Sequence, residues 1–102
     1  MIKREIERIE LKKDESYEFF LKNNEERFWD LIINAIELLS KDKELNVLTA
    51  FIVFGGKLKK DREIIVHRNG IDEIFKTALT KMELREEYEM CERLIKLQKK
   101  FD

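Results

Sequence analysis

The chain has 102 residues, of which 21 are Lys or Arg and 22 are Asp or Glu, so its formal net charge at pH 7 is −1. This balance excludes an overall electrostatic bias toward nucleic acid or an anionic membrane. A hydrophobic content of 43% argues against disorder. We therefore expect one domain over residues 1–102 with a modest core.

The chain carries one cysteine, which cannot form an intramolecular disulfide and fits a reducing compartment. Its first residues, MIKREIERIE, are charged and lack the apolar run of a signal peptide. The most apolar run, Val47 to Phe54, is too short to cross a bilayer. These features predict a cytoplasmic protein that does not enter a membrane.

The first segment has apolar residues at helical spacing. Ile2, Ile6 and Ile9 stand at i, i+4 and i+7, which predicts an amphipathic helix over residues 2–13. Ile9 and Leu11 also alternate, so a strand at 8–12 is the alternative. Residues 14–16 indicate a break with a new cap, and an aromatic turn follows at residues 17–21.

The central stretch, residues 24–39, predicts the helix around which the fold is built. Asn24 is a good N-cap, and Glu25 and Glu26 complement the helix dipole. The apolar positions sweep an arc of roughly 220°, whereas a surface helix needs only about 100°. One narrow polar stripe interrupts the arc. This helix must therefore be covered on more than one side, by its own chain or by a second copy.

Residues 45–54 are apolar on all sides, which fits a buried helix as well as a buried strand. The neighbouring helices and the stop at Gly55-Gly56 favour the helix. The β-branched residues Val47, Thr49, Ile52 and Val53 favour the strand. In the strand interpretation, residues 47–54 and 62–67 form a hairpin.

Two apolar faces in the last third point in nearly opposite directions. They predict a short helix at 71–79, a hinge near Thr80 and a final helix at 81–100. One straight helix that buries opposite faces at its two ends is the alternative. The expected fold is all-α, a compact bundle of four to five helices around residues 24–39. The alternative is α+β with the hairpin at 47–54/62–67.

No arrangement of residues indicates catalysis. His67 is the only histidine, and Cys91 lies on an apolar stripe between glutamates, where we expect a buried and unreactive thiol. One Cys and one His are too few for a structural zinc site. The chain has no Walker loop, serine elbow or dinucleotide fingerprint. The sequence therefore predicts a protein that is not an enzyme, with no catalytic residue, metal or cofactor.

Two sets of residues are candidates for binding. A basic loop could neutralise phosphates with Lys57, Lys59, Lys60, Arg62 and Arg68. The apolar faces exceed what a modest core needs, so some of their residues could form an interface: Trp29, Leu84, Tyr88, Cys91 and Ile95.

The expected function is that of a small accessory protein, a non-enzymatic protein–protein interaction module such as an inhibitor, adaptor or regulator. Its partner is another protein or a second copy in a homodimer. The alternative function is binding of nucleic acid, a nucleotide or another phosphate ligand by the basic loop 57–68.

Residues 86–98, EEYEMCERLIKLQ, resemble the UVR motif, a short helical interaction hairpin. Tyr88, Glu89 and Leu94 match, and Cys91 stands where the motif has a small residue. Ile95-Lys96 replaces the arginine–acid pair of the motif. We assign no function to this resemblance.

Overall fold

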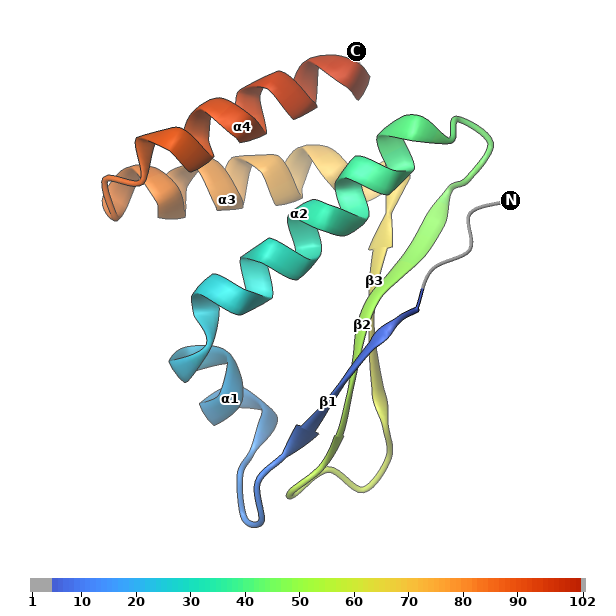
Figure 1. The fold of residues 1–102 in the computed structure, drawn as a ribbon, viewed down its shortest axis with the longest axis vertical. Coiled ribbons are helices and arrows are strands. Elements are labelled where there is room, and N and C mark those ends of the chain that lie inside the picture. The colour runs from blue at the N-terminus through green and yellow to red at the C-terminus, as the bar shows by residue number, and fades with distance from the viewer. Residues whose placement is uncertain (1–4, 102) are drawn as a thin grey trace.

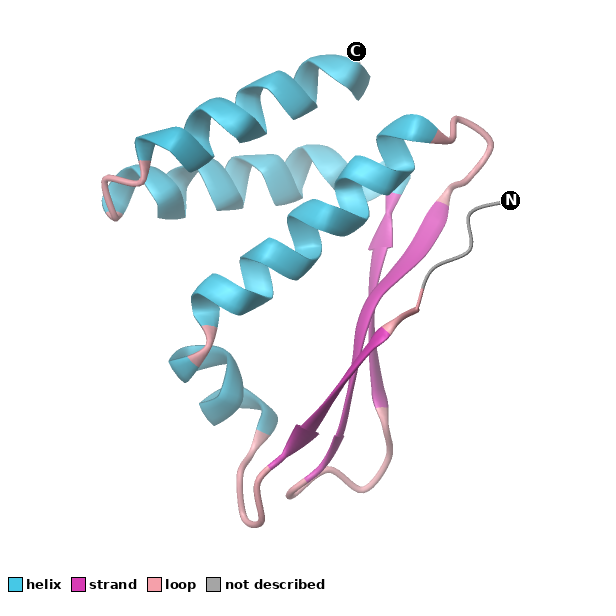
Figure 2. Cartoon of the chain, viewed as in Figure 1, coloured by secondary structure: helices cyan, strands magenta, loops and turns pink. Residues whose placement is uncertain are grey.

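The fold is α+β, as a computed structural model that describes residues 5–101 shows. Four helices and a three-stranded mixed sheet make up the chain (Figures 1 and 2). The all-α expectation is therefore wrong, and the α+β alternative fits. In chain order the elements are β1 (Glu7–Leu11), α1 (Tyr17–Asn23), α2 (Glu25–Lys41), β2 (Val47–Gly55), β3 (Arg62–His67), the 3-10 turn η1 (Arg68–Gly70), α3 (Ile71–Leu84), α4 (Tyr88–Gln98) and the 3-10 turn η2 (Lys99–Phe101).

The sheet has the order β1-β2-β3. β1 and β2 run parallel, and α1 and α2 form the crossover that such a pair requires. β2 and β3 form an antiparallel hairpin, which is the hairpin of the α+β alternative. A register shift between Thr49 and Phe51 marks a β-bulge at Ala50.

The first segment is a strand, so the helix expected over residues 2–13 is wrong; Ile2 lies outside the described residues. Ile9 and Leu11 are buried in the core, and Arg8 and Glu10, which alternate with them, are exposed. This period-two pattern is what a half-buried strand requires. Pairing with β2 decides the conformation, because five residues are too few for a stable helix without tertiary contacts.

The central helix is confirmed as α2, and its wide apolar arc is covered on two sides. One side packs on the sheet, mainly on β2, and the other meets α4. Ser16 caps the preceding helix α1, as expected, by accepting a hydrogen bond from the Phe19 amide at 3.1 Å. Asn24 does not cap α2 with its side chain, which donates back to the Phe20 carbonyl oxygen at 2.9 Å.

α3 and α4 form an antiparallel hairpin whose turn lies at residues 85–87, so the hinge expected near Thr80 is wrong. The Thr80 hydroxyl instead donates to the Lys76 carbonyl oxygen inside α3, at 2.9 Å. The turn has Schellman geometry, because the Glu87 amide donates to the Met82 carbonyl oxygen and the Glu86 amide to that of Glu83.

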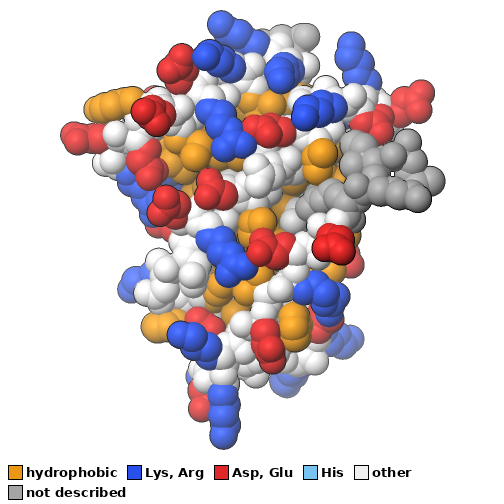
Figure 3. Space-filling view, viewed as in Figure 1, with side chains coloured by type: hydrophobic (Ala, Val, Ile, Leu, Met, Phe, Trp, Pro, Cys, Tyr) orange, Lys and Arg blue, Asp and Glu red, His pale blue; other side chains and the backbone are white. Residues whose placement is uncertain are grey.

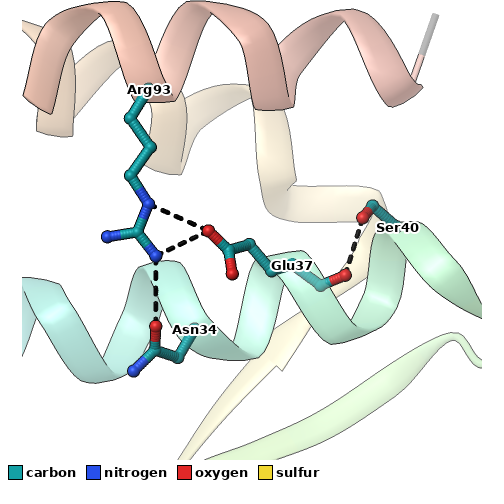
Figure 4. Close-up of polar contacts among 4 residues, drawn as sticks. All are labelled: Asn34, Glu37, Ser40 and Arg93. Carbon is teal, nitrogen blue, oxygen red and sulfur yellow. Dashed lines mark hydrogen bonds and ion pairs between the residues drawn. The ribbon is translucent and has the colours of Figure 1, made fainter.

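Arg93 fastens α4 to the polar stripe of α2 (Figure 4). Its Nε lies 2.9 Å from Oε1 of Glu37, and a terminal nitrogen lies 3.2 Å from Oδ1 of Asn34. Ser40 donates to the backbone oxygen of the same glutamate, at 2.6 Å. The stripe that interrupts the apolar arc of α2 is therefore the attachment point of α4.

All four helices lie on one face of the sheet, and no described element covers the other face (Figures 1 and 2). The core lies between the layers, around Phe51, Phe75, Ile33 and Leu39. The open face carries the exposed residues Val47 and Ile65. None of the helices within residues 5–101 has both the length and the apolar character needed to cross a bilayer.

Candidate docking groove

One hollow on the described surface follows the outer flank of α3. It encloses about 440 Å³ between that flank and the start of α2. One residue of α2, Glu25, and the helix cap Arg85 complete the wall. The α3 residues that line it recur at alternating intervals of three and one along the helix: Glu73, Lys76, Thr77, Thr80, Lys81 and Leu84.

A second hollow of about 270 Å³ adjoins the first and is mainly apolar. Leu21, Phe28 and Trp29 form its apolar wall, and Lys22 stands at its rim. It shares Glu25 and Lys81 with the first hollow. The two hollows therefore make one surface, the docking groove, with an apolar part at the α1–α2 junction and a polar part along α3.

The aromatic wall of the groove is fixed by packing. Phe28 makes edge-to-face contacts with Trp29, at 5.1 Å between ring centroids, and with Phe51 of β2, at 5.8 Å. Trp29 is only 7% exposed, so an edge of the indole reaches the groove. Such rings give a preformed apolar surface that loses little conformational entropy on binding.

The rim of the groove is mainly cationic. Lys22, Lys76, Lys81 and Arg85 face two carboxylates, Glu25 and Glu73, which leaves an excess of two positive charges. Glu25 accepts from Lys81 at 2.9 Å and also pairs with Arg85. The hydrogen bond from Lys81 is the main cause that lowers the pKa of Glu25, and both cations add to it. Lys22 and Lys76 form no ion pair within residues 5–101.

The structure brings two of the five predicted interface residues into this groove. Trp29 lines the apolar part, and Leu84, which is 81% exposed, lines the polar part. Tyr88 and Ile95 are exposed on α4, outside the groove. Cys91 is buried, and burial raises the pKa of its thiol, with a further contribution from Glu83 and Glu87. Cys91 therefore packs as a small apolar group.

The predicted phosphate-binding residues do not form one site. Lys57, Lys59 and Lys60 are exposed in the loop between β2 and β3. The Arg62 guanidinium stacks on the Tyr17 ring, 4.6 Å from its centroid. Burial raises the pKa of Tyr17, and the charge of Arg62 opposes that rise.

Arg68 is turned into the protein. It donates to the backbone oxygens of Leu39, Asp42 and Leu45 at distances of 2.6 to 2.9 Å. Its guanidinium also lies over the Phe101 ring, 5.5 Å from the centroid. Arg68 therefore joins the end of α2 to the loop before β2, and its donors face carbonyls inside the fold.

The loop after β1 lies beside the basic loop. The Lys57 amide donates to the Glu15 carbonyl oxygen at 3.0 Å, and both residues line a hollow with Lys12 and Lys13. Asp14 and Glu15 line the same hollow, so its charges nearly balance. The face in view shows the same alternation, with acidic and basic side chains interspersed throughout (Figure 3).

Sequence reasoning missed the groove residues Lys22, Lys76 and Lys81. The sequence pattern indicates only Lys76 and Lys81, which lie in α3. Polar residues recur there at helical spacing on the side opposite Phe75, Ala78 and Met82. That signal identifies an exposed flank, but it cannot show that the α1–α2 junction lies beside it.

Within residues 5–101, no group of three or more His, Cys, Asp or Glu side chains is placed to hold a metal ion. His67 is exposed on β3. Comparison of the chain with protein families, curated proteins and solved structures gives no match.

Proposed function

We propose that the protein is a non-enzymatic interaction module that binds an acidic amphipathic helix in the docking groove. The observation that carries the proposal is the continuity of an apolar hollow against Trp29 with a cationic flank along α3. A ligand for this surface needs apolar side chains on one stripe and carboxylates beside it. An amphipathic helix with residues anchored at i, i+3, i+4 and i+7 has this pattern.

In this mode the apolar stripe of the ligand packs on Leu21, Phe28 and Trp29. Its carboxylates meet Lys22 and Lys76, whose charges no described carboxylate pairs with. The apolar contact supplies most of the affinity, and the charges favour the acidic ligand over basic ones and speed its association. Inhibitor, adaptor and regulator roles all need this kind of binding and no chemistry.

Trp29 is the only tryptophan, so its fluorescence reports on the groove directly. We would titrate the protein with a helical peptide that has a leucine stripe flanked by glutamates. The expected result is a saturable change in Trp29 emission, with a Kd that rises as salt is added. The matched control peptide has lysines in place of the glutamates.

Two double variants localise the binding. Lys22→Glu with Lys76→Glu reverses the unpaired charges of the groove, and we expect it to raise the Kd about tenfold or more. Lys99→Glu with Lys100→Glu makes the same charge change in η2, which does not line the groove, and should leave the Kd unchanged. Equal binding of the acidic and basic peptides, or equal losses in the two variants, would refute the proposal.

A further inference from the structure

The turn between α3 and α4 combines carboxylates with an exposed apolar side chain, the two kinds of group that a ligand of the docking groove needs. Its residues surround a hollow of about 450 Å³ lined by Glu86, Glu87, Tyr88, Glu89 and Met90. Three of these five are carboxylates and none is a cation. Tyr88, the first residue of α4, is 66% exposed. We call residues 86–90 the acidic tip.

The acidic tip and the docking groove are complementary in both charge and polarity. The groove has an excess of two cations beside an apolar wall, and the tip has three carboxylates beside the exposed ring of Tyr88. Solvent exposure of Leu84 and Tyr88 is unfavourable in a free chain, because each leaves a large apolar surface in water.

The tip and the groove also lie at the same end of the molecule. Leu84 and Arg85 line the groove and lead directly into the turn. The turn and the start of α2 both lie on the side away from the sheet (Figure 1). A tip cannot fold back into its own groove, because α3 is one continuous helix through Leu84.

We infer that the occupant of the groove is the acidic tip of a second copy, and that two copies exchange tips about a two-fold axis. A two-fold axis relates the two copies, so every contact occurs twice. The tip of the first copy lies in the groove of the second, and the tip of the second lies in the groove of the first. Tyr88 enters the apolar part of the partner's groove, and the glutamates of the tip meet Lys22 and Lys76 across the interface. The inference rests on the proposed function of the groove.

Two charge-reversed variants test the exchange. The groove variant is Lys22→Glu with Lys76→Glu, and the tip variant is Glu87→Lys with Glu89→Lys. Each alone places like charges against each other in both contacts, so each should self-associate at least about tenfold more weakly than the wild type. Sedimentation at micromolar to millimolar concentrations, at low and at physiological salt, measures these constants.

An equimolar mixture of the two variants gives the decisive result. Both contacts of the mixed pair again join opposite charges, so the mixture should form a heterodimer that is tighter than the self-association of either variant alone. Failure of the mixture to associate, or self-association of the wild type that neither variant weakens, would overturn the exchange. A monomeric wild type over the whole concentration range would do the same.

The peptide titration separates this outcome from failure of the groove itself. The tip variant keeps an intact groove, so at concentrations where it is monomeric it should bind the acidic peptide as the wild type does. Peptide binding without self-association would leave the groove as a site for another protein and remove only the second copy. If neither peptide binding nor self-association is observed, the groove is not a binding site.

Discussion

At the scale of single residues, Arg68 shows how position in the fold decides what a charged side chain does. The last carbonyls of a helix have no partner inside the helix, and cations are favourable there. Arg68 meets this need for α2 by binding the Leu39 and Asp42 oxygens, and it holds Leu45 as well. Its partners lie 23 to 29 residues earlier in the chain, so no local pattern could separate it from the lysines of the basic loop.

We predict that Arg68→Ala lowers the free energy of unfolding by about 3 kcal/mol, because it leaves several carbonyls without their charged donor. Arg68→Lys should recover less than half of this loss, since an ammonium group cannot reproduce the planar fork of donors. Urea denaturation followed by circular dichroism measures both values. Lys43→Ala, an exposed change in the same loop region, is the control. A lysine variant as stable as the wild type would contradict this role.

At the scale of elements, the α3–α4 turn places a glutamate where glycine is usual. Glu86 has φ of 58°, in the left-handed region, at the position after the helix cap in a Schellman motif. A side chain in this conformation costs roughly 1 kcal/mol relative to glycine. Because no glycine stands here, the sequence carries no sign of a helix end at this turn, and the hinge that it predicts near Thr80 is wrong.

Glu86→Gly should therefore raise the free energy of unfolding by about 1 kcal/mol. Glu87→Gly removes an equal charge from the next position, where φ is −88°. This control should not raise the free energy of unfolding. Chemical denaturation at a protein concentration where the chain is monomeric keeps tip exchange out of the comparison. Equal effects of the two substitutions would show that charge, not backbone conformation, controls this turn.

The strands illustrate where element-scale prediction failed. Alternation in β2 is interrupted because the bulge at Ala50 places two successive buried residues, Ala50 and Phe51, on one side. Val47, Ile52 and Phe54 of β2 lie on the open face of the sheet, so apolar residues occur on both sides of this strand. A strand with these two features has no period-two signal, and the continuous apolar run resembles a buried helix.

At the scale of the whole molecule, the sequence was informative about α2 and uninformative about the groove. The wide apolar arc correctly required cover on two sides, because periodicity along one helix records burial directly. The groove depends on the distance between the α1–α2 junction and α3, which are about fifty residues apart in the chain. Trp29 and Leu84 were both identified as candidates, but only the tertiary fold brings them to one surface.

Glu25 links these distant parts, and its ion pairs make the link dependent on pH. Its carboxylate joins the first turn of α2 to Lys81 and Arg85 at the end of α3. These contacts lower the pKa of Glu25 below the value of about 4.3 in an unfolded chain. The folded state then holds fewer protons than the unfolded state, so the contribution to stability is complete above that value and is lost as pH falls through the folded pKa.

We predict that Glu25→Gln reduces the stability at pH 6.5 by less than about 1 kcal/mol, as expected for a partly exposed pair, and flattens the loss of stability between pH 5 and 3. Glu26→Gln is the matched control, because Glu26 is exposed and forms no ion pair within residues 5–101. Urea midpoints measured across this pH range give the two profiles. If the variants follow the same profile, Glu25 does not fasten α2 to α3, and the start of α2 must be held beside α3 by apolar packing alone.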